Sequence, residues 1–196
     1  MWMQLGAAAA LAGTYPFRGA VRSEPGGDIA VVQMLDASQV GREPDPSVPR
    51  VTNRDGKYNR YVLCPGDVLI QARGFRHPAE IVRLETRAIS APGLHVLRPD
   101  TSRITSGYLA WCLNHPKTQA AMASVAQGSH APFIAKQALA NVLIPVPSLA
   151  VQAQIAEVYR LREHERQLAA QLAAARDSLV NGAAWEAAVA SAEDAS

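Results

Sequence analysis

The stretch IPVPSLAVQAQIA, residues 144–156, decides the fold because it separates two regions of different character. Pro145 and Pro147 interrupt regular structure, and Ser148 can cap a helix that begins directly after it. No Gly or Pro follows until Gly182. The sequence therefore predicts a globular domain over residues 1–147, one long helix over residues 148–182 and a frayed, Ala-rich, acidic tail over residues 183–196.

A heptad pattern runs along the predicted helix. One seam position takes Val151, Val158, Glu165, Leu172 and Leu179, and the other takes Gln154, Leu161, Leu168 and Ala175. About 33 residues give roughly 50 Å of helix at about 1.5 Å per residue. A narrow apolar seam needs a cover, which is either a partner helix or the chain's own domain. We predict a coiled-coil homodimer whose contact residues are Val158, Leu161, Glu165, Leu168, Leu172 and Leu179.

The region before residue 147 mixes two kinds of pattern. Apolar runs of strand length occupy residues 29–35, 68–70, 81–84, 94–97 and 138–144, whereas residues 5–12, 105–113 and 117–125 have helical patterns. Gly- and Pro-containing polar segments between them indicate loops. The predicted fold class is α+β, with a mixed α/β domain followed by the single long helix.

Charge is distributed unevenly along the 196 residues. Residues 1–140 carry 15 Lys or Arg against 10 Asp or Glu, whereas residues 141–196 carry 4 against 7. The first part is therefore the part suited to phosphates. The two cysteines lie far apart in the sequence, and the first charge after the N-terminus is Arg18, which is atypical of an export signal. We expect a cytoplasmic protein with no membrane segment.

Enzyme motifs are scarce in the sequence. Phosphate-binding loops, nucleophile elbows and zinc-ligand spacings are absent, as is the catalytic loop of adenine methyltransferases. One loose match to a metal-dependent nuclease remains, formed by Asp45, Asp55 and Lys57. Asp55-Gly56 is also a common turn pair, which weakens this match. A small nuclease stays an alternative, and the main prediction is a non-catalytic protein without cofactor or metal.

Five segments together resemble the specificity subunit of type I restriction–modification systems. They are the turn Tyr15–Gly19; the segment Leu63–Ile70 with Arg73-Gly74; Gly107–Trp111 with Leu113-Asn114; Gly128-Ser129 with Phe133, Ile134, Lys136 and Leu139; and Ile144–Pro147 with Leu149, Gln152 and Gln154–Ala156. Each motif is weak alone, but all five occur in the family's order. The resemblance covers roughly residues 5–180.

This resemblance implies a target-recognition domain that reads half of a bipartite DNA site, followed by a spacer helix. It also implies partners: double-stranded DNA, an adenine DNA methyltransferase subunit, and in some systems a restriction or translocase subunit. Family members carry two such domains, so we expect a half-length form that dimerises. A truncated piece of a longer subunit is the alternative, and a third interpretation is an assembly or inhibitor protein that no longer binds DNA.

Loops carry many of the arginines, and loops are where recognition domains contact DNA. The predicted DNA-binding residues are Tyr15, Arg18 and Arg22 in the first turn; Arg54, Lys57 and Arg60 in a long loop; Arg73, Arg76 and His77 in a second loop; and Ser129, His130 and Lys136 in a third segment. Arg73 has an alternative role as an ion-pair partner of Asp67. His95, inside an apolar run, is predicted to be a core residue.

Overall fold

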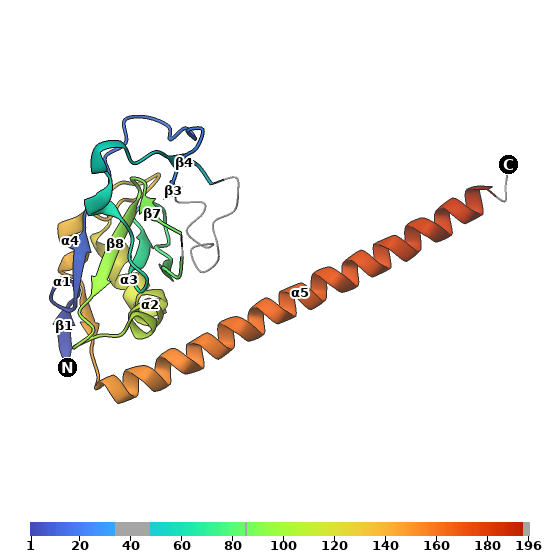
Figure 1. The fold of residues 1–196 in the computed structure, drawn as a ribbon. Helices are drawn as coiled ribbons and strands as arrows, with labels where there is room; N and C mark the ends of the chain where they lie inside the picture. Colours follow the sequence, from blue (N-terminus) through green and yellow to red (C-terminus); the bar gives the residue numbers. More distant parts are fainter. Residues whose placement is uncertain (34–47, 85, 194–196) are drawn as a thin grey trace. The chain divides into compact units, whose positions relative to one another are not determined.

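The computed structural model describes residues 1–33, 48–84 and 86–193. The chain divides into two compact units, Met1–Ala156 and Glu157–Ser196. Helices and short sheets make up the first unit, and a single long helix runs from the first unit through the second (Figure 1). The predicted fold class, an α+β domain followed by one long helix, is confirmed.

A four-stranded antiparallel sheet forms the centre of the first unit. Its order is β2 (Ala9–Ala12), β8 (Leu94–Pro99), β5 (Val68–Gln71) and β6 (Ala79–Ile81). Residues Val68 and Ile70 of β5 pack into one hydrophobic cluster, and Leu69 between them packs into another. This alternation follows from the two-residue period of a strand, and it means that the sheet is covered on both faces.

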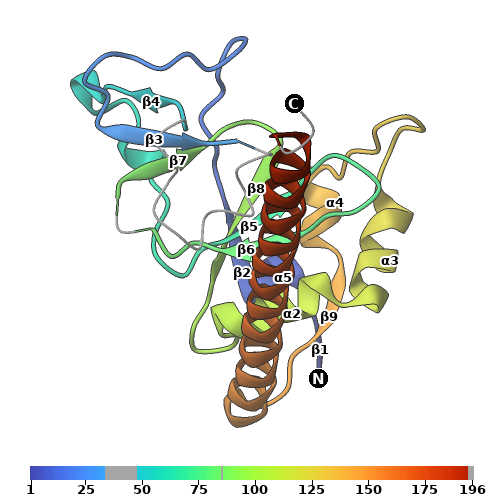
Figure 2. The same ribbon diagram turned by 90° about the vertical axis from the view of Figure 1, so that its right-hand side faces the viewer.

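A second sheet of three strands lies beside the first (Figure 2). It consists of β4 (Arg50–Val51), β3 (Ile29–Val32) and β7 (Ala88–Ser90), with β3 in the middle. Strand β3 runs antiparallel to β4 and parallel to β7. All four of its residues are buried, as expected for an apolar run at the centre of a sheet. Short 3-10 turns follow β4, namely η2 (Arg54–Gly56) and η3 (Asn59–Tyr61).

Four helices and a two-stranded sheet complete the part of the first unit that the structure describes. The helices are α1 (Leu5–Ala8), α2 (Ser106–Asn114), α3 (Pro116–Val125) and α4 (Lys136–Ala140), and β1 (Trp2–Gln4) pairs with β9 (Leu143–Pro145). Helix α2 begins at a capping residue, Thr105, whose hydroxyl accepts the Tyr108 N–H. Its buried residues, including Tyr108 and Leu109, join the larger hydrophobic cluster.

Helix α5 runs from Leu149 to Glu193. Its first turn is attached to the rest of the first unit by the buried side chain of Gln152. The amide of Gln152 is fully buried, accepts the N–H of Thr105 (2.9 Å) and donates to the carbonyls of Arg103 (2.8 Å) and Pro147 (2.9 Å). All donors and acceptors of this amide except one lone pair are thereby satisfied. Gln152 thus joins the start of α5 to the segment that precedes α2.

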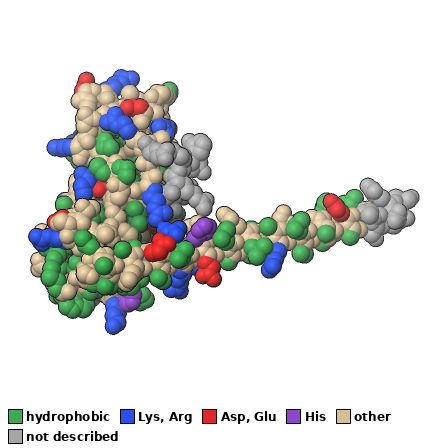
Figure 3. Space-filling view, turned by 60° about the horizontal axis from the view of Figure 1, so that its bottom comes forward, with side chains coloured by type: hydrophobic (Ala, Val, Ile, Leu, Met, Phe, Trp, Pro, Cys, Tyr) green, Lys and Arg blue, Asp and Glu red, His purple; other side chains and the backbone are tan. Residues whose placement is uncertain are grey.

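Further along α5, the seam side chains Val158, Leu161, Leu168, Leu172 and Leu179 are all exposed. Hydrophobic side chains recur along the helix in the space-filling view (Figure 3). The helix also continues through residues 183–193, which the sequence assigned to a frayed tail. Residues 194–196 lie outside the described part.

The structure corrects three predicted elements. Residues 5–12 form a one-turn helix followed by strand β2, because Ala9–Ala12 pair with β8 instead of continuing the helix. Residues 138–140 are the end of α4 and not part of a strand. The predicted strand at residues 81–84 is shifted, since β6 ends at Ile81. The end of the predicted strand 29–35 falls outside the described residues.

Candidate nucleic-acid interface

The first predicted turn and the long loop meet around one hollow in the first unit. The hollow is lined by Tyr15, Pro16, Phe17, Arg18, Gly19, Ala20, Val21, Arg22, Glu24, Val51, Lys57, Tyr58, Arg60 and Tyr61. Five of the six residues predicted in these two segments line it, and Arg54 of η2 is exposed nearby in the sequence. Four cations against one carboxylate leave the lining with an excess of positive charge, as a phosphate-binding surface needs.

Aromatic rings form the floor of this hollow. The ring of Tyr15 contacts Phe17 and Tyr58 with centroids 4.7 Å apart in both cases, and it contacts Tyr61 at 5.5 Å. All three contacts are edge-to-face, the arrangement that aromatic quadrupoles favour. Tyr58 is buried and belongs to the cluster beneath the three-stranded sheet. The rings therefore give the two loops a shared rigid base.

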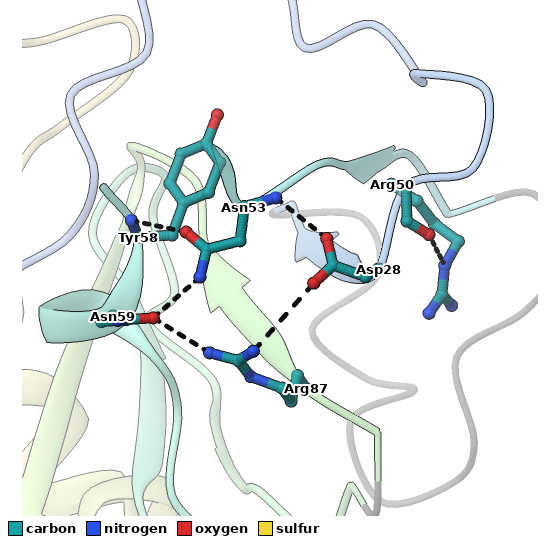
Figure 4. A network of polar contacts seen from close by, with 7 residues as sticks. Asp28, Arg50, Asn53, Tyr58, Asn59 and Arg87 are labelled. Atoms are coloured by element: carbon teal, nitrogen blue, oxygen red, sulfur yellow. Dashed lines mark hydrogen bonds and ion pairs between the residues drawn. The ribbon is translucent and has the colours of Figure 1, made fainter. Parts of the chain in front are cut away.

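A network of polar side chains holds the long loop against the three-stranded sheet (Figure 4). The N–H of Asn53 donates to Asp28 Oδ1 (2.9 Å), and Asn53 Oδ1 accepts the N–H of Tyr58 (3.1 Å). Asn59 Oδ1 accepts both from Asn53 Nδ2 (2.7 Å) and from an Arg87 Nη2 donor (3.1 Å). Between them lie Asp55 and Gly56, both with positive φ (59° and 67°). These bonds connect residues 53–59 to one another and to Asp28 and Arg87 beside the sheet.

Two loop cations lie on aromatic rings of this hollow. The ammonium of Lys57 is 4.7 Å from the centroid of Tyr58, and the guanidinium of Arg60 is 4.7 Å from that of Tyr61. A hydrogen bond with the Tyr58 side chain raises the pKa of Lys57, so the ammonium stays charged. The carboxylate of Glu24 is occupied by the N–H of Thr52 (3.0 Å), which lowers the Glu24 pKa.

The second loop and the third segment also lie side by side. The N–H of Gly74 donates to the carbonyl of Pro132 (2.9 Å), and the backbones of Arg73 and Phe133 form an isolated antiparallel β-bridge. The guanidinium of Arg73 lies 5.1 Å from the Phe133 ring centroid. Arg76, Ser129, His130 and Lys136 are all exposed on these two segments. The structure thus groups the remaining predicted residues at a second place, with one exception.

That exception is His77, whose side chain is only 1% exposed. Its Nδ1 is 2.8 Å from the carbonyl of Gln71, and its backbone N–H and C=O pair with the amide of Gln119 (3.0 and 2.8 Å). The prediction of a DNA contact by His77 is therefore wrong for this conformation. Its position next to Arg76 suggested an exposed loop residue, whereas the hydrogen bonds with Gln119 on α3 hold His77 in the interior.

Asp67 does not pair with Arg73, the alternative raised by the sequence. The Asp67 carboxylate is buried and accepts two hydrogen bonds from Arg98 (2.8 Å each) and one from the N–H of Cys64 (2.8 Å). Gly66, with φ of 90°, makes this turn possible. The guanidinium of Arg73 instead lies over the ring of Phe133. His95, predicted to be a core residue, is half-buried at the edge of the core; its Nε2 lies 2.7 Å from the Ile134 carbonyl, and burial lowers its pKa.

The nuclease alternative gains nothing from the structure. Asp45 lies outside the described residues, and Asp55 and Lys57 are exposed on the turn described above. Within residues 1–33, 48–84 and 86–193, no group of three His, Cys, Asp or Glu side chains is arranged to hold a metal ion. In the same ranges, no helix has both the length and the apolar character that crossing a membrane requires.

Comparisons with known proteins identify the fold. No family model matches the sequence, and no curated protein matches it. Among solved structures, the HsdS subunit from Thermoanaerobacter tengcongensis superimposes with a TM-score of 0.54 and 24% identity over 87% of this chain. The S subunit of a type I restriction–modification system from M. genitalium gives a TM-score of 0.58 at 10% identity over 84% of this chain. The chain has the fold of a type I S subunit.

A further chain, from a type I R-M system studied for complex assembly and conformational transition, gives a TM-score of 0.60 at 22% identity over 87% of this chain. This chain spans 38–39% of the length of the three solved chains, so it corresponds to part of an S-subunit fold. The resemblance drawn from the five sequence segments is confirmed at the level of the fold.

Proposed function

We propose that this chain is a DNA-specificity subunit that directs a partner adenine DNA methyltransferase to a bipartite site. It has no catalytic activity of its own in this proposal, and a restriction subunit is a further partner. The observation that carries the proposal is the S-subunit fold, combined with exposed cations on loops that fold together in two places. Arginine and lysine on ordered loops are the side chains that bind phosphates and base edges.

Removing Lys57 should weaken duplex binding at all sequences to a similar extent. If its ammonium contacts a phosphate, Lys57→Ala reduces the slope of log Kd against log salt concentration by about 0.9. The measurement is fluorescence anisotropy of a labelled duplex with the chain and its methyltransferase across a salt series. Lys117→Ala is the control, because Lys117 is an exposed lysine on α3 that does not line the hollow in which Lys57 lies.

Two outcomes would count against this interface. Salt-independent binding by the wild-type complex would contradict the DNA-binding function itself. Equal slopes for wild type, Lys57→Ala and Lys117→Ala would remove Lys57 from the contact surface.

The proposal includes a homodimer formed through α5. One exposed face of the helix carries the apolar residues Leu161, Leu168, Ala169 and Leu172, with His164 and Glu165 among them. A second copy of the same helix is self-complementary to it under two-fold symmetry. Near the middle of the seam, Glu165 needs a basic neighbour if it is covered. Arg162 of the second copy suits this role better than Arg166, which already pairs with Glu163 (2.9 Å) in its own helix.

An antiparallel arrangement of the two helices would present two identical recognition domains to the DNA. Identical domains related by a two-fold axis read identical half-sites. The proposed target is therefore a palindrome interrupted by a spacer of fixed length.

A further inference from the structure

The arginines of the described residues differ in what their guanidinium groups contact. Five of them face carboxylates, namely Arg87, Arg98, Arg103, Arg160 and Arg166. Arg50 donates to the carbonyl of Gly27 (3.1 Å). Two others, Arg60 and Arg73, lie over aromatic rings, and within the described part of the chain neither forms an ion pair with a carboxylate.

The ring under Arg60 is fixed by its surroundings. Tyr61 is half-buried, contacts the ring of Tyr15 and ends the short turn η3. The Arg60 Nη2 donor also bonds the Tyr61 hydroxyl, so the guanidinium is held both by the ring face and by its rim. The side-chain oxygen of Asn59, directly before Arg60, accepts hydrogen bonds from Asn53 and Arg87, and the N–H of Tyr61 donates to the Tyr58 carbonyl (2.8 Å) across Arg60. A side chain held in this way loses little entropy when it binds a ligand.

The ring under Arg73 is fixed in a different way. The backbone of Phe133 makes two hydrogen bonds with Gln127 (2.8 and 2.9 Å), and its ring is 6.0 Å from that of His95. The carbonyl of Arg73 accepts from Gln71 Nε2 (2.8 Å). Thus the backbone of Arg73 and the ring beneath its side chain are both restrained, although each comes from a different loop.

The chemistry of a stacked guanidinium decides what it can read. Stacking orients the plane but leaves N–H donors at its edge, and such an edge fits the O6 and N7 acceptors of guanine with two parallel hydrogen bonds. By contrast, Arg18, Arg22, Arg54 and Arg76 are exposed, and within residues 1–33, 48–84 and 86–193 none of them lies over an aromatic ring. Exposed cations without such a support suit phosphates, which require charge more than orientation.

We propose that Arg60 and Arg73 are the two specificity-determining arginines of this chain, each reading one guanine, and that Tyr61 and Phe133 are their positioning residues. This inference rests on the proposed DNA-specificity function. It assigns guanine to two positions of the DNA half-site, and it assigns the other exposed loop arginines to contacts with DNA phosphates.

The test uses charge-conserving substitutions. The full chain with its methyltransferase is used to select from a pool of duplexes with a randomised segment, and the retained duplexes are sequenced. Arg60→Lys and Arg73→Lys should each lose the preference for one guanine, at two different positions, by roughly 5- to 150-fold. Because the charge remains, the salt slope on a mixed-sequence duplex should not change. Arg76→Lys, on the same loop as Arg73 but without a ring, is the matched control and should select the wild-type motif.

Substitutions of the ring separate positioning from folding. Phe133→Leu keeps an apolar side chain but removes the ring, and it should lose the same guanine preference as Arg73→Lys. Phe133→Tyr retains the ring and should retain the preference. The inference is overturned if the wild type selects a motif that Arg60→Lys and Arg73→Lys both keep. It is also overturned if Arg76→Lys loses the preference. In both cases the proposed DNA-specificity function stands. If the wild type selects no motif, the proposed function fails, and the inference fails with it.

Discussion

Replacing Leu161 and Leu168 together by Glu is expected to convert a dimer of this chain into a monomer. Both leucines are exposed on α5, at 52% and 54%, and lie on the same face of the helix. Burying a leucine side chain contributes roughly 1.5–3 kcal/mol, and a two-fold interface uses each leucine twice. Loss of these contacts, together with introduced like charges, should weaken association by more than about 1000-fold. Light scattering at micromolar concentration measures the mass directly.

Val180→Glu is the control for this substitution. Val180 is as exposed as the seam leucines and lies on the same helix, but its heptad position is next to the seam instead of within it. This variant should remain dimeric. A monomeric wild type, both alone and with the methyltransferase, would contradict the dimer, and so would a leucine double variant that keeps the mass of two copies.

Gln152→Leu is expected to destabilise the first unit by about 3 kcal/mol. The substitution leaves the N–H of Thr105 and the carbonyls of Arg103 and Pro147 without the amide that now binds them. An unsatisfied buried polar group costs about 1–3 kcal/mol, and relaxation of the surrounding chain reduces the sum for three groups. Urea unfolding followed by circular dichroism measures the change in the free energy of unfolding.

Gln167→Leu is the matched control on the same helix. The side chain of Gln167 is exposed and occupies neither seam position, so its replacement should change the free energy of unfolding by less than about 0.5 kcal/mol. If the two variants unfold at the same urea concentration, Gln152 is not the attachment that the structure indicates.

The motifs that revealed the fold in the sequence turn out to be residues that hold the fold together. Asp67 caps its own turn and binds Arg98, and the amide of Asn114 exchanges two hydrogen bonds with the backbone of Ala79. At Gly107 an added Cβ would lie 2.9 Å from the Ala156 Cβ, so helix α2 and the start of α5 require a glycine there. Only the turn that Asp67 caps is local in sequence, whereas the contacts of Asp67 with Arg98 and of Asn114 with Ala79 join residues 31 and 35 positions apart. A sequence motif therefore shows one side of such a contact and not its partner.

Other parts of the fold were not predictable because distant segments decide them. The alanines at positions 9–12 favour helix by intrinsic propensity, but pairing with β8 overrides that preference. His77 follows a loop with two arginines, and only Gln119, which is 42 residues later, draws its backbone onto α3. No periodicity in the sequence signals either contact.

The candidate interface was predicted as a set of loop residues but not as a geometry. Sequence reasoning selected Arg60 and Arg73 with eight other basic or imidazole side chains, and nothing in the sequence distinguished them from Arg76 or Arg54. The rings of Tyr61 and Phe133 were overlooked as supports because aromatic residues in loops have no characteristic spacing. The contact between Arg73 and Phe133 joins positions 60 residues apart, which only the folded chain brings together.

The most direct measurement is the adenine methylome of cells that express the partner methyltransferase with and without this chain. With the chain present, we expect methylation at an interrupted palindrome whose half-site contains guanine, and the same cells without the chain should lack methylation at that motif. An asymmetric motif would contradict the two-fold arrangement but leave DNA specificity intact. A methylation pattern that is identical with and without the chain would contradict the proposed function itself.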